Sequence, residues 1–507
     1  MADDSLCDRS ALALRRMIGA KQVSPVEVLE AFIARIDRIN PAVNAMVAMD
    51  TDRAHGAARR AEAAVMKGEA LGPLHGLPVG VKDLEETAGL RTTWGSPQFE
   101  HHVPKADEWH IAALRRAGAI VLGKTNVPEF GAGANSVNKV YGACGNPFDP
   151  MLTAAGSSGG SAAALACGLV PLATGSDTGG SLRNPAAFCG VIGYRVTVGL
   201  IPTPKRAFGW TVLSTLGPMA RNVPDTALML SAMVGDDSAD ALATTVKGFA
   251  VQTAERYFPL PECDLSGLRV AFSPDLGFAP TDAHYRRVFA DRTAIMRGWF
   301  AHGVDAHPDM TGADAAFEVL RASNFLVKHL ETYRTRPDLL GPNLIANVEE
   351  GLRYSLEDYA RAHATQTQIY QRTQAFFRDH DLLITPGITR GPFPWTTLYP
   401  AEIDGRPTRT YFHWLALAYG VTLTGHPSIL LPCGVDEAGL PFGIQVVGPR
   451  GSDAWLLRAA AALERRLADD ARTARPLPDL ARLAASPPLQ AKSLEMLRPV
   501  LYPNRAA

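Results

Sequence analysis

Long apolar runs, closely spaced cysteine pairs and an excess of either charge are all missing from this sequence of 507 residues. No uninterrupted apolar run is long enough to span a bilayer, and the acidic start MADDSLCDRS has no apolar core of a secretory signal. We therefore expect a cytoplasmic protein that has no membrane partner. Lys and Arg number 50 and Asp and Glu 51, so the charge gives no reason to expect a nucleic-acid partner either.

The six cysteines are scattered along the chain, and none belongs to a C-x-x-C pair. In a chain of this length, such spacing favours reduced thiols over a disulfide framework or a zinc site. The cysteines are Cys7, Cys144, Cys167, Cys189, Cys263 and Cys433.

Apolar residues make up 47% of the chain, which is enough for a large core. Helical patterns alternate with short β-branched runs along the whole sequence. We expect strands over 78–81, 268–272, 382–386, 428–432 and 443–447, and helices that begin at Ser24 or cover 51–67, 281–302 and 454–466. No linker or internal repeat interrupts this order, so we expect a single α/β domain over residues 1–507.

The most distinctive stretch runs from Thr153 to Gly193 and contains two turns rich in glycine and serine, 156–161 and 175–181. Glycine lets a backbone approach a reacting atom closely, so two such turns around a short helix and a strand indicate a site. A flexible linker is the alternative interpretation, but the continuation ALACGLVPLATG is too apolar to be exposed.

A phosphate-loop pattern, G-x-x-x-x-G-K-T, occurs at residues 118–125. Nucleotide binding by this motif needs a glycine-rich nest that leads into a helix. Here the middle residues are Ala, Ile, Val and Leu, and the following Asn-Val-Pro is a poor start for a helix. We interpret the segment as a buried strand.

Two further motifs in the central stretch fit their usual context poorly. Residues 156–160 match the G-x-S-x-G nucleophile elbow with Ser158 as nucleophile, but a turn-rich segment stands where a buried strand is required. Residues 177–179 resemble half of an aspartic-protease site, and no second D-T-G or D-S-G supplies the other carboxylate.

Seven segments together resemble the amidase signature family, from about residue 10 to about residue 470. Their shared order and spacing make this match far more specific than any single motif. The segments are PLHGLPVGVKD ending at Asp83, GKTNVPEFG (123–131), GSSGGSAAALA (156–166), GSDTGGSLRNPAAFCG (175–190), GPMARNVPDTALML (217–230), LTGHPSILLPCG (423–434) and GLPFGIQVVGPRGSD (439–453).

The resemblance implies an amidase-signature α/β fold, in which a large mixed β-sheet core is covered on both faces by α-helices. Within the single domain we expect N-terminal helices over 8–68 and a signature core over about 70–235. From about 475 to 507 we expect a peripheral C-terminal tail that is Pro-rich and irregular.

The resemblance also implies a catalytic triad of two serines and a lysine. Ser181 would be the nucleophile, Ser157 the bridging serine on a cis peptide bond, and Lys82 the base. A serine hydroxyl needs a base within hydrogen-bond reach, and lysine can serve only where its surroundings keep it neutral. A lone lysine is usually a solvated surface residue, but Lys82 ends an apolar run where burial is expected.

Supporting groups follow from the same turns. Ser158 would assist the proton relay, and backbone N–H groups would form an oxyanion hole that contributes roughly 3 kcal/mol per donor in the transition state. We interpret Asp177 and Arg183 as a structural ion pair. The expected oxyanion donors are Thr178, Gly179, Gly180 and Ser181. This mechanism needs no metal ion, flavin or nucleotide, so we expect no cofactor.

The implied activity is hydrolysis of a small-molecule carboxylic amide to an acid and an amine or ammonia through an acyl-enzyme. Esters and carbamates of similar shape are open to the same chemistry. Aromatic residues are frequent over 205–214 and 391–414, and these loops either line an apolar substrate pocket or pack in the core. Enzymes with this fold often dimerise, so a homodimer remains an open possibility.

The alternative function is the glutaminase (A) subunit of a tRNA-dependent amidotransferase. That role needs an arginine and an acid to hold the two charged ends of glutamine. The stretch 341–348 has no arginine and 411–415 has no acid, although Arg334 and Arg336 lie close to the first stretch. The missing pair favours the amidase.

Overall fold

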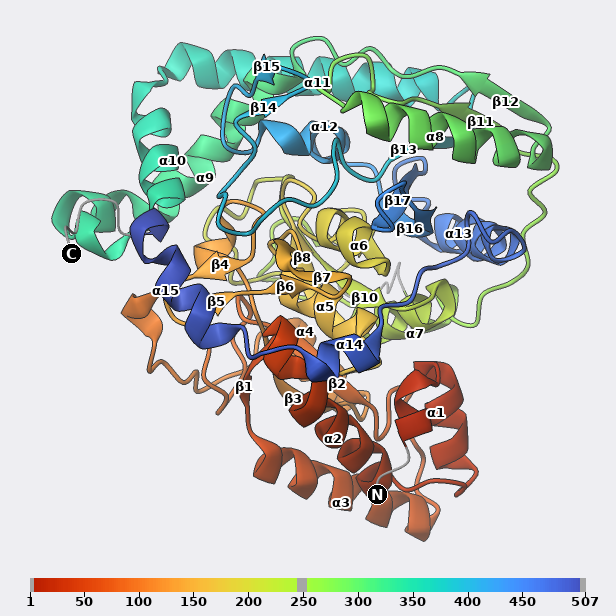
Figure 1. The fold of residues 1–507 in the computed structure, drawn as a ribbon. Helices are drawn as coiled ribbons and strands as arrows, with labels where there is room; N and C mark the ends of the chain where they lie inside the picture. The colour runs from red at the N-terminus through yellow and green to blue at the C-terminus, as the bar shows by residue number, and fades with distance from the viewer. Residues whose placement is uncertain (1–3, 244–252, 502–507) are drawn as a thin grey trace.

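The computed structural model describes residues 4–243 and 253–501, and an 11-stranded sheet lies at its centre (Figure 1). The strands of this sheet are β1 (Met46–Met49), β2 (Pro78–Lys82), β3 (Ile120–Thr125), β8 (Leu172–Asp177), β9 (Ile192–Arg195), β10 (Thr215–Ala220), β11 (Arg269–Phe272), β12 (His302–Asp305), β13 (Leu382–Pro386), β16 (Ser428–Val435) and β17 (Pro441–Val447). Their order in space is β1-β3-β2-β8-β10-β9-β16-β17-β13-β11-β12.

The sheet is mixed, as the resemblance implies. Parallel pairs join β2 to β3 and β8, and β11 to β12 and β13, whereas the other neighbours are antiparallel. Short two-stranded ladders lie outside it: β4 (Val137–Asn138) with β5 (Gly142–Ala143), β6 (Gly145–Asn146) with β7 (Asp149–Thr153), and β14 (Glu402–Ile403) with β15 (Arg406–Pro407).

Helices cover the sheet. They are α1 (Ala11–Gly19), α2 (Pro25–Val43), α3 (Thr51–Lys67), α4 (Trp109–Arg116), α5 (Gly159–Ala166), α6 (Arg183–Cys189), α7 (Val223–Met233), α8 (Ala283–Met296), α9 (Ala313–Thr335), α10 (Pro342–Arg353), α11 (Leu356–Phe376), α12 (Ala416–Thr424), α13 (Asp453–Ala468), α14 (Leu480–Ala485) and α15 (Gln490–Leu501). Helices α5 and α6 pack together on the central strands, and α7 and α13 form a second such pair. The central strands β2, β9 and β10 are buried along their whole length, as expected for a sheet covered on both faces.

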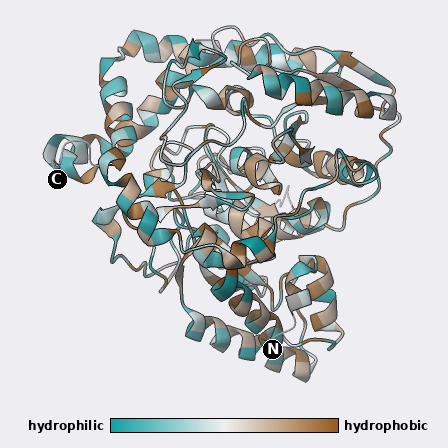
Figure 2. Ribbon diagram, viewed as in Figure 1, coloured by the Kyte–Doolittle hydropathy of each residue, from teal (hydrophilic) through white to brown (hydrophobic). Residues whose placement is uncertain are grey.

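The outer helices are amphipathic. Figure 2 shows hydrophilic and hydrophobic residues alternating along the helices at the top of the molecule. In α10 the buried residues fall three and four positions apart, the spacing of a single apolar face: Leu344, Asn347, Val348 and Gly351. Among the helices of residues 4–243 and 253–501, none is both long and apolar enough to cross a membrane.

The N-terminal segment forms the expected helices and one strand that the sequence did not indicate. Ser24 caps α2 with a complete capping box, because its side chain accepts from Glu27 N and the Glu27 carboxylate accepts from Ser24 N. Strand β1 then pairs with β3 at the edge of the sheet. A four-residue edge strand carries too little periodicity to be recognised from sequence.

The C-terminal tail is not irregular as expected, because residues 480–485 and 490–501 form α14 and α15. Both helices rest on distant segments: Leu489 N donates to Pro41 O at 2.8 Å, and Ala143 N donates to Ser493 Oγ at 2.9 Å. Of the prolines that suggested an irregular strap, Pro476 and Pro478 precede α14, Pro487 and Pro488 lie between the helices, and Pro499 lies within α15. The expected tail extends to residue 507, and its last six residues lie outside the described ranges.

Candidate active site

Strand β2 ends at Lys82, and its ammonium group lies among three serine hydroxyls. Lys82 Nζ donates to Ser157 Oγ and Ser158 Oγ at 2.8 Å each, and to Ser176 Oγ at 2.9 Å. The lysine is fully buried because β2 runs between β3 and β8 in the interior of the sheet. The structure therefore places Lys82 in direct contact with Ser157 and Ser158 of the first turn.

Burial lowers the pKa of Lys82 to about 7, although the negative charges of Glu85 and Asp177 oppose this change. A general base works best when its pKa lies near the working pH. Lys82 can therefore accept a proton near neutral pH, which an ordinary surface lysine cannot do.

The two glycine- and serine-rich turns meet beside this lysine. The first turn contains a cis peptide bond between Gly156 and Ser157 and leads into α5. The second turn follows β8 and carries Ser181, whose backbone carbonyl accepts from Ser158 N at 3.2 Å. In the described part of the chain, no hydrogen bond joins the hydroxyls of Ser157 and Ser181.

The expected oxyanion donors are not all free. The N–H group of Gly180 donates to Asp177 Oδ1 at 2.9 Å, so this member of the expected set is already engaged. The backbone of Gly180 is in the left-handed region, with φ at 101°, and this conformation turns its N–H toward the carboxylate. The N–H groups of Thr178, Gly179 and Ser181 remain as candidates.

The expected ion pair of Asp177 and Arg183 is confirmed, and it includes a second arginine. Arg183 and Arg195 contact Asp177 Oδ1 at 2.9 and 3.2 Å, and all three side chains are fully buried. Burial alone would raise the pKa of Asp177, but the two guanidinium groups hold it well below its usual value. The cluster fixes the turn between Asp177 and Ser181. Sequence reasoning missed Arg195, because a strand residue gives no local sign of such a partner.

Comparison with known proteins shows the family of this chain. A family model described as Amidase matches residues 27–457. The chain belongs to the amidase signature family. It is therefore a hydrolase that acts on amide bonds.

Relatives of this amidase include enzymes of two kinds. An acylamidase from Rhodococcus erythropolis is 34% identical over 468 residues, covering 92% of this chain and 96% of that protein. The A subunit of a glutamyl-tRNA(Gln) amidotransferase from Thermus thermophilus is 36% identical over 485 residues, covering 90% and 96%. The crystal structure of a bacterial aryl acylamidase is 26% identical with a TM-score of 0.83, covering 95% and 99%.

The phosphate-loop pattern of this amidase is a buried strand, as expected. Residues 120–125 form β3 and are all buried. The side chain of Lys124 donates to the carbonyl of Glu85 and, at 3.1 Å, to Thr87 Oγ1. Within the described ranges, the amidase also has no group of three or more His, Cys, Asp or Glu side chains that could hold a metal ion.

Aromatic side chains cover the turn that carries Gly179 in this amidase. A Cβ atom placed on Gly179 would lie 3.2 Å from Phe317 Cζ, on helix α9. Phe317 stacks on Tyr419, with ring centroids 4.3 Å apart, and its edge meets Phe412 at 5.7 Å. Arg321, one turn further along α9, lies over Phe412 at 4.3 Å. The sequence of α9 gives no local sign of this contact with Gly179, because the contact depends on tertiary packing.

The two aromatic-rich loops have different environments in the amidase. Tyr399 and Tyr411 line a cavity of about 760 Å³ between α9, α10 and the loop 398–411. By contrast, Trp395 and Trp414 are fully buried in the core. In the segment 205–214, Trp210 is 76% exposed. Within these two loops, the stretch 398–411 therefore lines this cavity, and the adjacent Phe412 packs on Phe317 next to Gly179.

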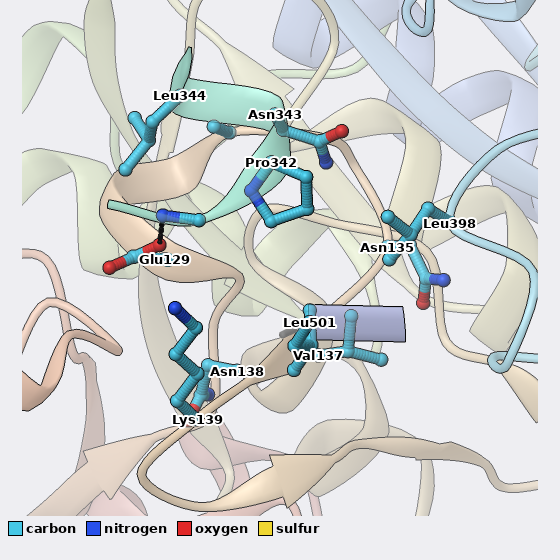
Figure 3. Close-up of a pocket in the computed structure, with 12 residues that line it drawn as sticks. Glu129, Asn135, Val137, Asn138, Lys139, Pro342, Asn343, Leu344, Leu398 and Leu501 are labelled. Atoms are coloured by element: carbon cyan, nitrogen blue, oxygen red, sulfur yellow. Dashed lines mark hydrogen bonds between the residues drawn. The ribbon is translucent and has the colours of Figure 1, made fainter. Parts of the chain in front are cut away.

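A second, smaller cavity of about 20 Å³ lies beside the loop that carries Glu129 (Figure 3). On its wall, Glu129 Oε2 accepts from Gly341 N at 2.8 Å, which ties the loop to the start of α10. Two residues further on, a Cβ atom on Gly131 would lie 3.3 Å from Ser157 Oγ. The cavity has room for about one water molecule, so it is too small to hold a substrate.

Proposed function

We propose that this amidase cleaves a carboxylic amide through an acyl-enzyme, with Ser181 as nucleophile, Ser157 as bridging serine and Lys82 as base. The observation that carries the proposal is the buried contact of 2.8 Å between Lys82 Nζ and Ser157 Oγ. A buried lysine with a pKa of about 7 has the basicity that such a relay requires.

In the proposed mechanism, neutral Lys82 takes a proton from Ser157 while Ser157 takes one from Ser181. The Ser181 oxygen attacks the amide carbon, and the resulting oxyanion accepts from the N–H groups of Thr178, Gly179 and Ser181. The reverse relay protonates the departing amine, because an amide anion is a poor leaving group. Water then hydrolyses the Ser181 ester and regenerates the enzyme. Ser158 holds the ammonium group of Lys82 during these transfers.

We propose apolar or aromatic amides as the substrate class. Phe317, Phe412 and Tyr419 form an apolar surface next to Gly179, where the acyl or amine group of the substrate would lie. The acylamidase and aryl acylamidase among the relatives are consistent with this class. The same relay would attack esters and carbamates of similar shape.

A glutaminase role remains the second candidate, because the A subunit of a glutamyl-tRNA(Gln) amidotransferase is 36% identical. The residues that left this role open do not support it. Arg334 and Arg336 are both exposed at the end of α9, and Arg336 pairs with Asp338 at 3.0 Å. No acidic residue stands at 411–415 to hold an amino group. These observations favour the amidase over the glutaminase.

Labelling with a fluorophosphonate followed by peptide mapping tests the proposal. We expect an adduct on Ser181, no adduct in Ser181→Ala, and a loss of turnover in that variant of about 10⁴-fold or more at unchanged melting temperature. Ser238→Ala, which changes an exposed serine, is the matched control. An adduct on Ser158 would overturn the assignment. A panel of aryl amides, alkyl amides and glutamine then separates the two candidate functions.

A further inference from the structure

A buried carboxylate–imidazole pair lies next to Lys82. Glu85 follows Lys82 by three positions, and its Oε2 atom lies 3.1 Å from Nε2 of His110 on helix α4. Glu85 is 2% exposed and His110 is 1% exposed. Neither residue belongs to a motif of the sequence that indicates a role, and neither takes part in the proposed mechanism.

One hydroxyl joins this pair to the strand of the proposed base. The backbone N–H of Lys82 donates to Thr174 Oγ1 at 2.9 Å, and the Thr174 hydroxyl donates to Glu85 Oε2. The same carboxylate oxygen therefore accepts from Thr174 and from His110. The connection is buried along its whole length, where charge interactions are strong because little water screens them.

We propose that Glu85 and His110 are positioning residues that hold Lys82 through Thr174 and set its protonation equilibrium. The proposal rests on the proposed function in one respect, namely that Lys82 is the base. The pair touches neither Ser157 nor Ser181 by any hydrogen bond in the described ranges, so its effect must pass through Lys82.

The charge state of the pair follows from its contacts. Burial alone would raise the pKa of Glu85, but His110 and Thr174 bring it below its usual value. Burial would lower the pKa of His110, but the hydrogen bond and charge of Glu85, aided by Glu108, raise it. Each partner therefore favours the charged form of the other, an ionised carboxylate on Glu85 and a protonated imidazole on His110.

Other charged groups face Glu85 and His110 and influence the charge state of this pair. Lys124 on β3 donates to the Glu85 carbonyl, and Asp83 adds a negative charge beside Lys124. Glu108 Oε2 lies 3.8 Å from His110 Nδ1, and Asp107 adds a further charge near Lys124. The negative charge of Asp177 also favours the protonated form of Lys82. Glu85 and His110 carry opposite charges, so substituting one or the other should change the pKa of Lys82 in opposite directions.

Two substitutions should move the acid limb of the kcat/KM profile in opposite directions. Glu85→Gln removes a negative charge near Lys82, so the lysine loses its proton more easily and the limb should move to lower pH by roughly one unit. His110→Gln keeps a donor for Glu85 but removes the positive charge, so the limb should move to higher pH. Glu86→Gln, which changes the neighbouring acid that pairs with Lys205, should leave the limb in place.

The reciprocal effect can be measured without turnover. In the Ser181→Ala background, imidazole NMR should show the pKa of His110 rising when Lys82→Met removes the lysine charge, because coupling between two sites acts equally in both directions. The rise in the pKa of His110 should equal the shift of the acid limb that His110→Gln causes. This measurement also stands if Glu85→Gln fails to fold.

The outcomes separate this proposal from the proposed function. The proposal would be overturned if the acid limb stays fixed in folded Glu85→Gln and His110→Gln, or if the pKa of His110 does not change in Lys82→Met. The pair would then be purely structural. A coupled His110 titration in a protein that shows no Ser181 adduct would instead overturn only the catalytic assignment.

Discussion

The Nζ atom of Lys82 lies 2.8 Å from Oγ of Ser157, although 75 positions separate the two residues in the chain. The contact is formed because β2 and the turn before α5 meet at one end of the sheet, where no water reaches the ammonium group. A charged group in such a place is costly unless it loses its charge. Activity and stability should therefore both depend on this contact and on the side chains that hold the turns in place.

Lys82→Met should remove the base while preserving the packing of the lysine stem. We expect kcat/KM to fall by about 10³-fold or more, the usual contribution of a positioned base. In the wild type, kcat/KM should rise with pH through about 7, because the neutral lysine is the active form and burial lowers its pKa to about 7. Steady-state kinetics across pH checks both statements. Lys105→Met, at an exposed lysine, should change neither.

The same substitution should affect stability in a pH-dependent way. Between the folded pKa of about 7 and the ordinary value of 10.5, the unfolded chain binds the lysine proton more tightly, so wild-type stability rises with pH across this window. Lys82→Met removes that dependence and should stabilise the fold most below about pH 7. Thermal unfolding of both proteins at several pH values measures the difference, and a constant difference would contradict the buried-lysine interpretation.

Asp177→Asn should be strongly destabilising, because it leaves Arg183 and Arg195 buried with their shared negative charge removed. We expect a loss of about 3–5 kcal/mol in the free energy of unfolding. Asp381→Asn breaks the half-exposed pair with Arg269 and should cost below about 1 kcal/mol. Urea denaturation compares the two, and equal costs would argue against an electrostatic role for the Asp177 cluster.

Gly180→Ala should distort the turn before the proposed nucleophile. The added Cβ would lie 2.4 Å from Ala418 Cβ and 2.5 Å from Asn184 Oδ1, at a φ of 101° that L side chains rarely adopt. We expect kcat to fall by at least about tenfold together with a lower melting temperature. Gly267→Ala, at a site with nothing within 4 Å of the new atom, should leave both unchanged.

Phe317→Leu should change substrate preference. The ring stacks on Tyr419 and reaches Gly179, so its loss removes aromatic surface next to the reacting group. We expect the ratio of kcat/KM for an aryl amide over an alkyl amide to fall by roughly tenfold, the scale of one apolar contact. Phe300→Leu changes a buried ring that meets Phe272 elsewhere and should cost stability without altering the ratio. An equal ratio in the wild type, Phe317→Leu and Phe300→Leu would show that Phe317 does not contact the substrate.

Much of the fold could be predicted from sequence because its signals are local. The capping box of Ser24 and Glu27, the apolar run before Lys82 and the buried character of residues 120–125 depend on near neighbours, and the structure confirms each of them. The ion pair of Asp177 and Arg183 could also be predicted, because both residues flank one turn.

Contacts between distant segments could not be predicted in the same way. His110 reaches Glu85 across 25 positions, and Arg195 reaches Asp177 only because β9 and β8 both lie against β10. The engagement of the Gly180 N–H depends on a left-handed backbone conformation that a glycine permits but does not dictate. Helices α14 and α15 lie among prolines, and their stability comes from packing on α2 and β5.

The pairing of β9 with β16 has a consequence for biosynthesis. Arg195 lies opposite Ser428, so the side of β9 that faces away from β10 has no partner until the ribosome has added more than two hundred further residues. During that interval the nascent chain exposes an apolar strand edge of the kind that recruits other chains. Strand β16 begins at Ser428, so closure of the sheet waits for roughly the last sixth of the 507 residues to be translated, and chaperone dependence should be highest in chains that stop before residue 428.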